Sequence, residues 1–426
     1  MQKIAAKVTD QLGFFETNDP TRLAEEYGTP LYVYNERILR QKCRELKGLV
    51  KYPNFVVDYS AKANSNLAFL QIVHSEGLEV DAMSPGEIYL ELMAGFAPRQ
   101  IFYICNNVSE EEMKYAIDKG VITSVDSLSQ LEQYGRLNPG GEVAVRFNPG
   151  VGAGHHEKVV TAGKKTKFAV DAELVPQVKE ILAKYDLKLI GINQHIGSLF
   201  MDGKAFTQSV ASLLEIAKQF PGLEFIDMGG GFGIPYHKQT DEPPLDLADL
   251  GHHLDETLAA FAKEYGREVT FRIEPGRYIS AECSVLLGTV HAVKENHGKK
   301  FIGTDIGFNV LQRPIMYDSF HGIEVFRSSD KKSTKEETVT VVGNICESGD
   351  ILAKDRVLPE IFEGDTLAVL DAGAYGQVMS SNYNSRLRPA EILIRENGSV
   401  QLIRSRDTLD DLMRHQIPLE DESSNL

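Results

Sequence analysis

The sequence predicts an α/β protein with a (β/α)8 barrel of the TIM type, followed by a mostly β domain. Short β-rich runs alternate with amphipathic helical stretches over about 220 residues, which is typical of such a barrel. Polar or glycine-rich motifs follow the carboxyl ends of these runs, where β/α barrels carry their active sites. After residue 280 the pattern changes to strand-like runs with turn signals and few helical stretches, which indicates a second domain.

Eight β-rich runs are predicted to form the barrel strands. They are NFVVDYS (54–60), LEVDA (78–82), IFYIC (101–105), VITSVD (121–126), EVAVRF (142–147), LKLIGINQH (187–195), LEFIDM (223–228) and VTFRIE (269–274). Helical patterns lie between most of them, and one begins with a capping box at Ser109 and Glu112. This many β/α units favour a closed barrel over a doubly wound sheet, which usually has fewer strands. We expect the barrel to occupy residues 36–280.

The β-rich domain is expected to combine residues 1–35 with residues 281–426. Five strand-like runs between residues 284 and 406 support this, namely SVLLGTVHAVKE, KKFIGTDIG, ETVTVVGNI, DTLAVLDAG and AEILIRENGSVQLIRSR. Within the barrel, the connection 148–170 has too many glycines for a helix and is a candidate cover for the barrel mouth.

Composition excludes several classes of function. Lys and Arg number 45 and Asp and Glu 61 in 426 residues, a formal net charge of −16 without a basic stripe, so we expect no nucleic-acid or anionic-membrane partner. The four cysteines are scattered, which argues against a disulfide framework or a zinc site, and we expect no metal. No signal-peptide core or membrane-spanning run is present, so the sequence predicts a cytoplasmic protein.

Lys62 lies in the stretch DYSAKANSN (58–66), at the end of the first predicted barrel strand and between two alanines. Most lysines at strand ends are surface residues. At a barrel mouth with small neighbours, however, an amine can lose hydration, and its lowered pKa makes it a nucleophile toward an aldehyde. Lys62 is therefore a candidate for forming a Schiff base.

Three further motifs follow later strands. The backbone N–H groups of GGGFG (229–233), with Gly231 at its centre, can cradle a phosphate, although a tight turn also explains these glycines. In EPGR (274–277), Glu274 can pair with a protonated ring nitrogen and Arg277 with a phosphate or carboxylate; a structural Glu–Arg ion pair is the alternative. In HIGS (195–198), His195 can lie against an aromatic ring and Ser198 can donate to a phosphate, or the histidine is structural. The combination points to pyridoxal 5′-phosphate.

The motifs YSAKAN, HIGS, GGGFG and EPGR together make the chain recognisable. It resembles the diaminopimelate decarboxylases, within the alanine-racemase-like group of pyridoxal-phosphate enzymes, from TPLYVYNE to RPAEILIRENG. The resemblance implies the barrel fold, the pyridoxal 5′-phosphate cofactor, and the reaction of meso-2,6-diaminopimelate to L-lysine and CO₂ at the end of lysine biosynthesis. The cofactor contacts that it implies are Lys62, His195, Ser198, Gly231, Glu274, Gly276, Arg277 and Tyr375.

The resemblance also implies the substrate contacts. These are Arg277, Arg313 and Tyr317 of GFNVLQRPIMYDSFH, Glu347 of CESGD, and Tyr375 of GAYG. Diaminopimelate has an amino-acid head at each end, so paired arginines can hold the far carboxylate while Glu347 binds the far ammonium.

Lys62, His195 and Cys346 are the catalytic residues that the resemblance implies, and Cys346 is the expected proton donor because a thiol is mostly protonated at neutral pH. In the family, this cysteine and Glu347 enter the partner subunit's site, which implies a homodimer with shared active sites. The alternative for Cys346 is a buried core thiol, and for Arg313-Pro314 a turn at a strand end.

Other functions remain open at this point. A related decarboxylase of ornithine, arginine, or a siderophore or polyamine precursor would share the barrel motifs. A non-enzymatic cofactor-binding regulator and a racemase are further alternatives. Retention of Lys62 and Cys346 argues against the regulator, and CESGD argues against a racemase, which needs a catalytic tyrosine opposite the lysine.

Overall fold

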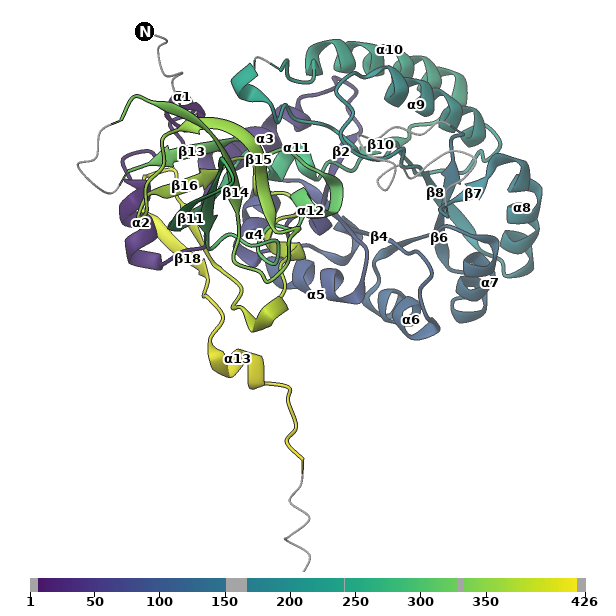
Figure 1. Ribbon diagram of the computed structural model, residues 1–426. Helices are drawn as coiled ribbons and strands as arrows, with labels where there is room; N and C mark the ends of the chain where they lie inside the picture. The colour runs from purple at the N-terminus through teal and green to yellow at the C-terminus, as the bar shows by residue number, and fades with distance from the viewer. Residues whose placement is uncertain (1–6, 151–166, 241, 328–332, 420–426) are drawn as a thin grey trace, which may run out of the picture.

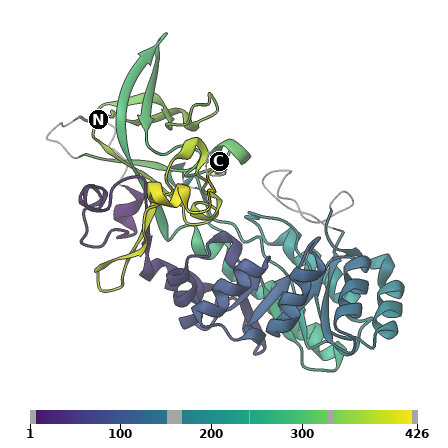
Figure 2. The same ribbon diagram turned by 90° about the horizontal axis from the view of Figure 1, so that it is seen from below.

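A computed structural model describes residues 7–150, 167–240, 242–327 and 333–419. Figures 1 and 2 show two bodies side by side: a barrel wrapped by helices, and a smaller β-rich body that carries both the beginning and the end of the described chain. Among the described residues, no helix is both long enough and apolar enough to cross a membrane.

The predicted barrel is confirmed. Its parallel strands follow one another in the order β2, β3, β4, β5, β6, β8, β9 and β10, and the pairing of β10 with β2 closes the ring. The strands are β2 (Phe55–Ser60), β3 (Glu79–Ala82), β4 (Ile101–Ile104), β5 (Ile122–Val125), β6 (Glu142–Asn148), β8 (Lys188–Asn193), β9 (Phe225–Asp227) and β10 (Thr270–Ile273). Each lies inside one of the predicted runs or within a residue of it. The short β7 (Val170–Asp171) pairs with the end of β6.

Helices cover the outside of this barrel (Figure 1). They are α3 (Glu36–Lys47), α4 (Leu67–Ser75), α5 (Pro85–Ala94), α6 (Glu110–Lys119), α7 (Leu128–Leu137), α8 (Val175–Lys184), α9 (Lys204–Ala217), α10 (Leu247–Tyr265) and the single turn α11 (Arg277–Ser280). The capping box predicted for α6 is present, because Ser109 Oγ accepts from the Glu112 backbone and the Glu112 carboxylate accepts from the Ser109 backbone.

The second sheet runs in the order β15, β14, β12, β11, β1, β17, β18, with β16 joining β11 to β13. Its strands are β1 (Leu31–Asn35), β11 (Ser284–Asn296), β12 (Lys299–Thr304), β13 (Ile323–Phe326), β14 (Glu336–Val342), β15 (Ile351–Pro359), β16 (Thr366–Val369), β17 (Ala390–Ile394) and β18 (Val400–Arg404). The sequence runs named above omit β1, β13 and β15. Strand β1 lies between β11 and β17, so a segment that precedes the barrel is central to this sheet.

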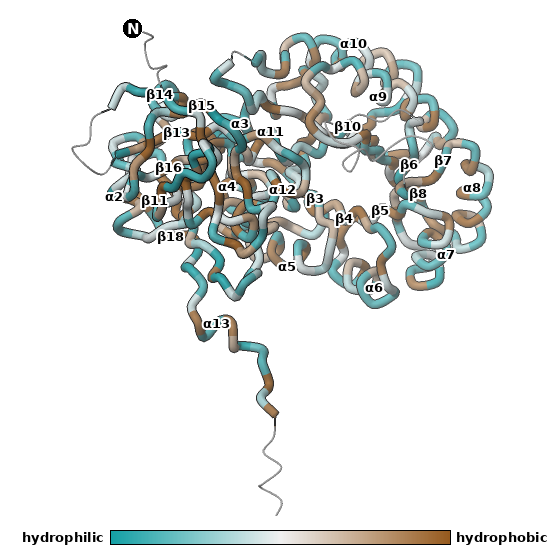
Figure 3. The backbone as a smooth tube through the Cα atoms, in the orientation of Figure 1, coloured by the Kyte–Doolittle hydropathy of each residue, from teal (hydrophilic) through white to brown (hydrophobic). Residues whose placement is uncertain are grey.

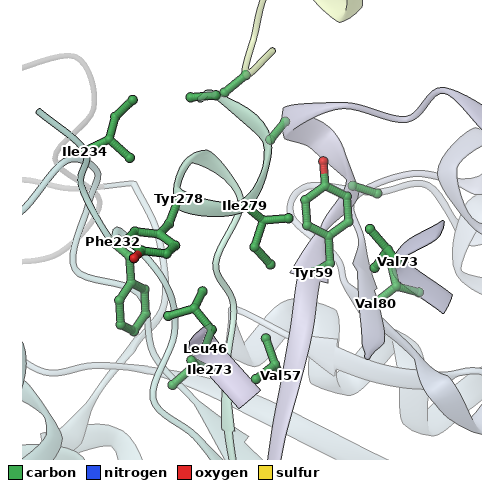
Figure 4. Packing of buried hydrophobic residues seen from close by; sticks show 14 of the residues in the cluster. Leu46, Val57, Tyr59, Val73, Val80, Phe232, Ile234, Ile273, Tyr278 and Ile279 are labelled. Atoms are coloured by element: carbon green, nitrogen blue, oxygen red, sulfur yellow. The ribbon is translucent and has the colours of Figure 1, made fainter. Parts of the chain in front are cut away.

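Four short helices complete the β-rich body: α1 (Val8–Gln11), α2 (Pro20–Tyr27), α12 (Arg313–Tyr317) and α13 (Leu409–Met413). Apolar strands lie inside both bodies and polar residues lie mostly outside (Figure 3). A single cluster of buried side chains extends from the barrel through α11 into the second sheet. Figure 4 shows part of this cluster, where Tyr59 and Val57 of β2 lie near Ile279 of α11. The continuous core holds the two bodies in a defined relation at the barrel mouth.

Candidate active site

Lys62 lies in a one-turn 3₁₀ helix, Ala61–Ala63, directly after β2. Its Nζ donates to Ser60 Oγ at 3.1 Å and lies 3.5 Å from Asp81 Oδ2, at the end of the neighbouring β3. Burial by itself lowers the pKa of Lys62, as predicted. The charge of the Asp81 carboxylate has the opposite effect on this pKa, and the net shift is upward. The expectation of a lowered lysine pKa is therefore wrong for this structure, because the sequence does not reveal that Asp81 faces the amine.

Glu274 follows β10 and is buried, with Oε2 3.4 Å from His195 Nδ1. The same Nδ1 accepts a hydrogen bond from the Gly230 backbone at 3.2 Å. Burial lowers the pKa of His195, so the ring is neutral at neutral pH. Burial alone would raise the pKa of Glu274, but hydrogen bonding to His195 and Asp227 lowers it to about 2. The structure places an ionised carboxylate beside a neutral imidazole at the barrel mouth.

The glycine-rich loop after β9 packs directly on the ends of the neighbouring strands. A Cβ at Gly230 would lie 1.9 Å from the Glu274 carbonyl oxygen, and one at Gly231 would lie 2.7 Å from the Gly197 carbonyl oxygen. Gly231 also has φ +106°, a conformation that favours glycine. These positions bring the loop backbone beside the HIGS and EPGR motifs.

Arg277 begins α11 and is buried. Its Nη2 donates to Ser198 Oγ at 3.0 Å and its Nη1 donates to Tyr236 Oη at 2.8 Å. The alternative of a Glu274–Arg277 ion pair is not found, since the ion pairs among the described residues include none between these two side chains. Arg277 therefore links the HIGS motif to Tyr236.

Arg313, the first residue of α12, is only 2% exposed. Its Cζ lies 4.7 Å from the centre of the Tyr236 ring, and its Nη1 lies 2.8 Å from His321 Nε2. Burial lowers the pKa of Arg313, and the charge of Arg277 lowers it further. Across the described residues, neither arginine forms an ion pair with a carboxylate. Two cationic side chains thus face one tyrosine without a carboxylate in ion-pair contact among the described residues, and Asp371 acts on Arg313 only at longer range.

The region around Arg277 also contains Tyr375, Gly276 and Tyr317. The Tyr375 backbone N–H donates to the Ala63 carbonyl at 2.8 Å, and its ring centre lies 5.0 Å from Arg277 Cζ. A Cβ at Gly276 would lie 3.0 Å from Ala63 Cβ and 3.3 Å from the Tyr375 hydroxyl oxygen. Tyr317 is half-buried at the end of α12 and interacts electrostatically with Arg277.

Cys346 and Glu347 lie apart from this group, between β14 and β15, and both side chains are exposed. The Cys346 backbone N–H donates to Asn384 Oδ1, and Tyr383 Oη donates to Glu347. Among the described residues, no hydrogen bond or ion pair joins either side chain to Lys62, Arg277 or Arg313. The alternative of a buried core thiol is wrong for Cys346.

Four site residues were absent from the predicted contacts: Asp81, Arg146, Asp227 and Tyr236. Asp81 and Asp227 end barrel strands, and Tyr236 closely follows the glycine-rich loop, so position at the barrel mouth was the available signal. Arg146, in β6, is buried and interacts electrostatically with Glu274. The predicted cover of the barrel mouth falls mainly on residues 151–166, outside the described residues.

The residues present fit pyridoxal 5′-phosphate. Lys62 presents an amine for the aldehyde, and the tightly packed glycine loop beside Ser198 and Arg277 suits a phosphate. Glu274 Oε1 is buried and has no hydrogen-bond partner among the described residues, as expected of an acceptor for a ring N–H. The three groups correspond to the three polar ends of this cofactor.

Comparison with known proteins supports this reading. The family described as "Pyridoxal-dependent decarboxylase, pyridoxal binding domain" matches residues 36–281. The diaminopimelate decarboxylase of Methanothermobacter thermautotrophicus is 46% identical over 408 residues, which cover 93% of this chain and 94% of that protein. The crystal structure of the Helicobacter pylori diaminopimelate decarboxylase with L-lysine has a TM-score of 0.85 and 30% identity, covering 96% of this chain and 100% of that one.

The likeness to a more distant decarboxylase supports the fold alone. The Vibrio vulnificus lysine/ornithine decarboxylase, solved with putrescine, is 21% identical, with a TM-score of 0.75. The resemblance stated from the motifs is confirmed by the nearly full-length matches. The chain belongs to the diaminopimelate decarboxylase family of pyridoxal-dependent enzymes.

Proposed function

We propose that this protein decarboxylates meso-2,6-diaminopimelate to L-lysine and CO₂, the last step of lysine biosynthesis. The observation that carries the proposal is the pair Arg277 and Arg313, buried around Tyr236 without a carboxylate partner among the described residues. Such a pair suits the second carboxylate of a two-headed substrate. Ornithine has no carboxylate there and would leave both charges unmatched, so the geometry disfavours it.

Lys62 would hold the aldehyde of pyridoxal 5′-phosphate, Glu274 its ring nitrogen, and Ser198 with the Gly231 loop its phosphate. When bound, the cofactor supplies an electron sink that lets the substrate carboxylate leave as CO₂. Lys62 must lose a proton before its amine can react. The Asp81 carboxylate, with Oδ2 3.5 Å from Lys62 Nζ, would hold and orient the charged amine until that proton is lost.

Cys346 is proposed as the acid that protonates the decarboxylated carbon, and Glu347 as the partner of the far ammonium. Both are exposed in the connection between β14 and β15, which supports a homodimer in which this connection enters the site of the other subunit. We propose that the dimer acts in the cytoplasm.

The test is mass-spectrometric detection of lysine after the cofactor-loaded protein is incubated with meso-diaminopimelate, ornithine or arginine in separate reactions. Equimolar lysine and CO₂ from diaminopimelate, without products from the other two, is the expected result. Putrescine from ornithine, or agmatine from arginine, would assign the enzyme to a related decarboxylase. A Lys62→Ala variant should lack the visible absorbance of the bound cofactor, and an unchanged spectrum would contradict the role of Lys62.

A further inference from the structure

Two acidic side chains share a buried position behind the proposed ring-nitrogen site. Asp227 is the last residue of β9 and is 0% exposed, and Glu274 follows the adjacent strand β10. The backbone between them is fixed, since Glu274 N donates to the Gly229 carbonyl at 3.0 Å. The two carboxyl groups interact, since each of them affects the pKa of the other through hydrogen bonding.

Each of the two carboxyl groups has one oxygen that accepts no hydrogen bond from an N–H or O–H group of the described residues. Within the described residues, Asp227 Oδ2 and Glu274 Oε1 are both buried and unpartnered. The other oxygen of Asp227, Oδ1, accepts from the Gly229 backbone at 2.8 Å. A proton on Asp227 must therefore be on Oδ2, because Oδ1 already serves as an acceptor.

His195 Nδ1 lies 3.4 Å from Glu274 Oε2 and also accepts the Gly230 N–H at 3.2 Å, so the imidazole contacts one oxygen of Glu274 and leaves Oε1 without a partner among the described residues. Two ionised carboxylates at this separation in a buried site would repel each other strongly. One shared proton removes that repulsion and satisfies an orphaned oxygen.

We propose that Asp227 is a neutral carboxylic acid whose Oδ2–H group donates to Glu274, and that it is a positioning residue that keeps Glu274 ionised and aimed at the cofactor ring nitrogen. The part of this proposal that concerns the ring nitrogen rests on the proposed function. The protonation of Asp227 does not, because it follows from the packing of β9 against β10.

The charges around the pair are consistent with this assignment. Burial and the charge of Glu274 raise the pKa of Asp227 well above its usual range, and Asp58 of β2 raises it further. Arg146 of β6 interacts with both carboxyl groups, with Glu274 more strongly than with Asp227, and Lys62 also favours the ionised form of Glu274. The single proton of the pair therefore belongs to Asp227.

The first test needs no cofactor and no activity. An infrared difference spectrum between the cofactor-free wild-type protein and Asp227→Asn at neutral pH should show loss of the carbonyl band of a protonated carboxylic acid. Asp171→Asn, which removes the exposed aspartate at the end of β7, should instead show loss of carboxylate bands. Loss of only carboxylate bands in Asp227→Asn would overturn the proposal, whatever substrate the enzyme uses.

The second test measures cofactor binding. Asparagine can accept from Gly229 and donate to Glu274, whereas leucine can do neither. We expect Asp227→Asn to bind pyridoxal 5′-phosphate within about threefold of the wild type, and Asp227→Leu to bind it at least about tenfold more weakly. In Asp227→Leu the visible spectrum should also change with pH as the ring nitrogen loses its proton. Equal loss of affinity in both variants would show that Asp227 acts as an anion and overturn the proposal.

Discussion

At the scale of single residues, Arg313 combines a binding role with a cost to folding. It is almost fully buried, its neighbours are another arginine, a tyrosine ring and a neutral histidine, and burial lowers its pKa. A buried charge without an ion partner destabilises the folded state. The proposed substrate carboxylate would remove this cost only when it binds.

Arg313→Met should therefore separate stability from activity. We expect the melting temperature of the cofactor-free protein to stay the same or rise, while kcat/KM for diaminopimelate falls by about 10²-fold to 10³-fold, as for loss of a charge-assisted hydrogen bond. Thermal unfolding and steady-state kinetics measure the two effects. Arg414→Gln, an exposed arginine beyond α13, is the matched control and should change neither. A lower melting temperature with unchanged kinetics would make Arg313 a structural residue.

His321 provides a pH-dependent contribution to stability. Its Nδ1–H donates to the Leu370 carbonyl and its Nε2 accepts from Arg313, both at 2.8 Å, so the neutral ring fits both contacts. Burial, followed by the charges of Arg313, Arg277 and Arg356, holds its pKa well below the usual value. The unfolded state therefore binds a proton near pH 6.5 that the folded state does not bind.

Because of this difference, the contribution of His321 to the free energy of unfolding is full above about pH 6.5 and is lost as the pH falls, by up to about 1.4 kcal/mol per pH unit. Urea unfolding of the wild type and of His321→Gln between pH 8 and 5.5 measures it, as the variant should show a shallower dependence on pH. The same slope in both proteins would assign the pH dependence to other groups.

At the scale of elements, the loop after β9 depends on glycine because it packs against the backbone of its neighbours. Gly229, Gly230 and Gly233 each leave no room for a Cβ. The added atom would approach the carbonyl oxygen of Gln194, Glu274 or Phe200, respectively, and these residues lie in or beside the HIGS and EPGR segments. The loop and the two segments therefore form one rigid unit. A substitution in this unit should weaken cofactor binding more than it disturbs the rest of the barrel.

Gly230→Ala should displace the Glu274 backbone, because the new Cβ would lie 1.9 Å from its carbonyl oxygen. We expect at least about tenfold weaker cofactor binding and a loss of stability of about 1–3 kcal/mol, as for overpacking. Equilibrium titration of the cofactor and urea unfolding measure the two effects. Gly222→Ala is the control, since its Cβ would have nothing within 4 Å. If Gly230→Ala bound the cofactor as the control does, the close packing would not support the site.

At the scale of the whole molecule, the proposed catalytic groups are divided between two places on one chain. Lys62, Glu274 and the arginines gather where the barrel meets the β-rich body, whereas Cys346 is exposed in the connection between β14 and β15. If this connection of one subunit completes the site of the other, two different inactive variants can complement each other.

Mixing Lys62→Ala with Cys346→Ala, after subunit exchange, tests this arrangement. Half of a random mixture is mixed dimers, and each has one site with both residues intact, so about a quarter of wild-type activity should return. The assay is lysine production before and after exchange, and sedimentation confirms that dimers are present. Activity that stays at the level of the separate variants would place both residues in the site of a single chain.

The barrel strands and the order of the motifs were predictable from the sequence, because alternation of strand and helix patterns and short glycine-rich turns are local properties of the chain. Lys62, His195, Gly231, Glu274 and Arg277 could be placed at one barrel mouth for the same reason: each follows a predicted strand, and parallel strands end at one edge. The local pattern was less informative in the second sheet, whose strands β1, β13 and β15 lay outside the runs named from the sequence.

Only the tertiary structure decided which side chains face each other at the barrel mouth and which strands are neighbours in the second sheet. Asp81 raises the pKa of Lys62, Tyr236 lies against both Arg277 and Arg313, and β1 is inserted between β11 and β17. Each of these relations joins segments that lie apart in the chain, so no local pattern encodes it. The sequence by itself determined which chemical groups reach the barrel mouth, and the packing of β strands and the β-rich body determined their charges and partners, because burial and neighbouring charge depend on three-dimensional distance.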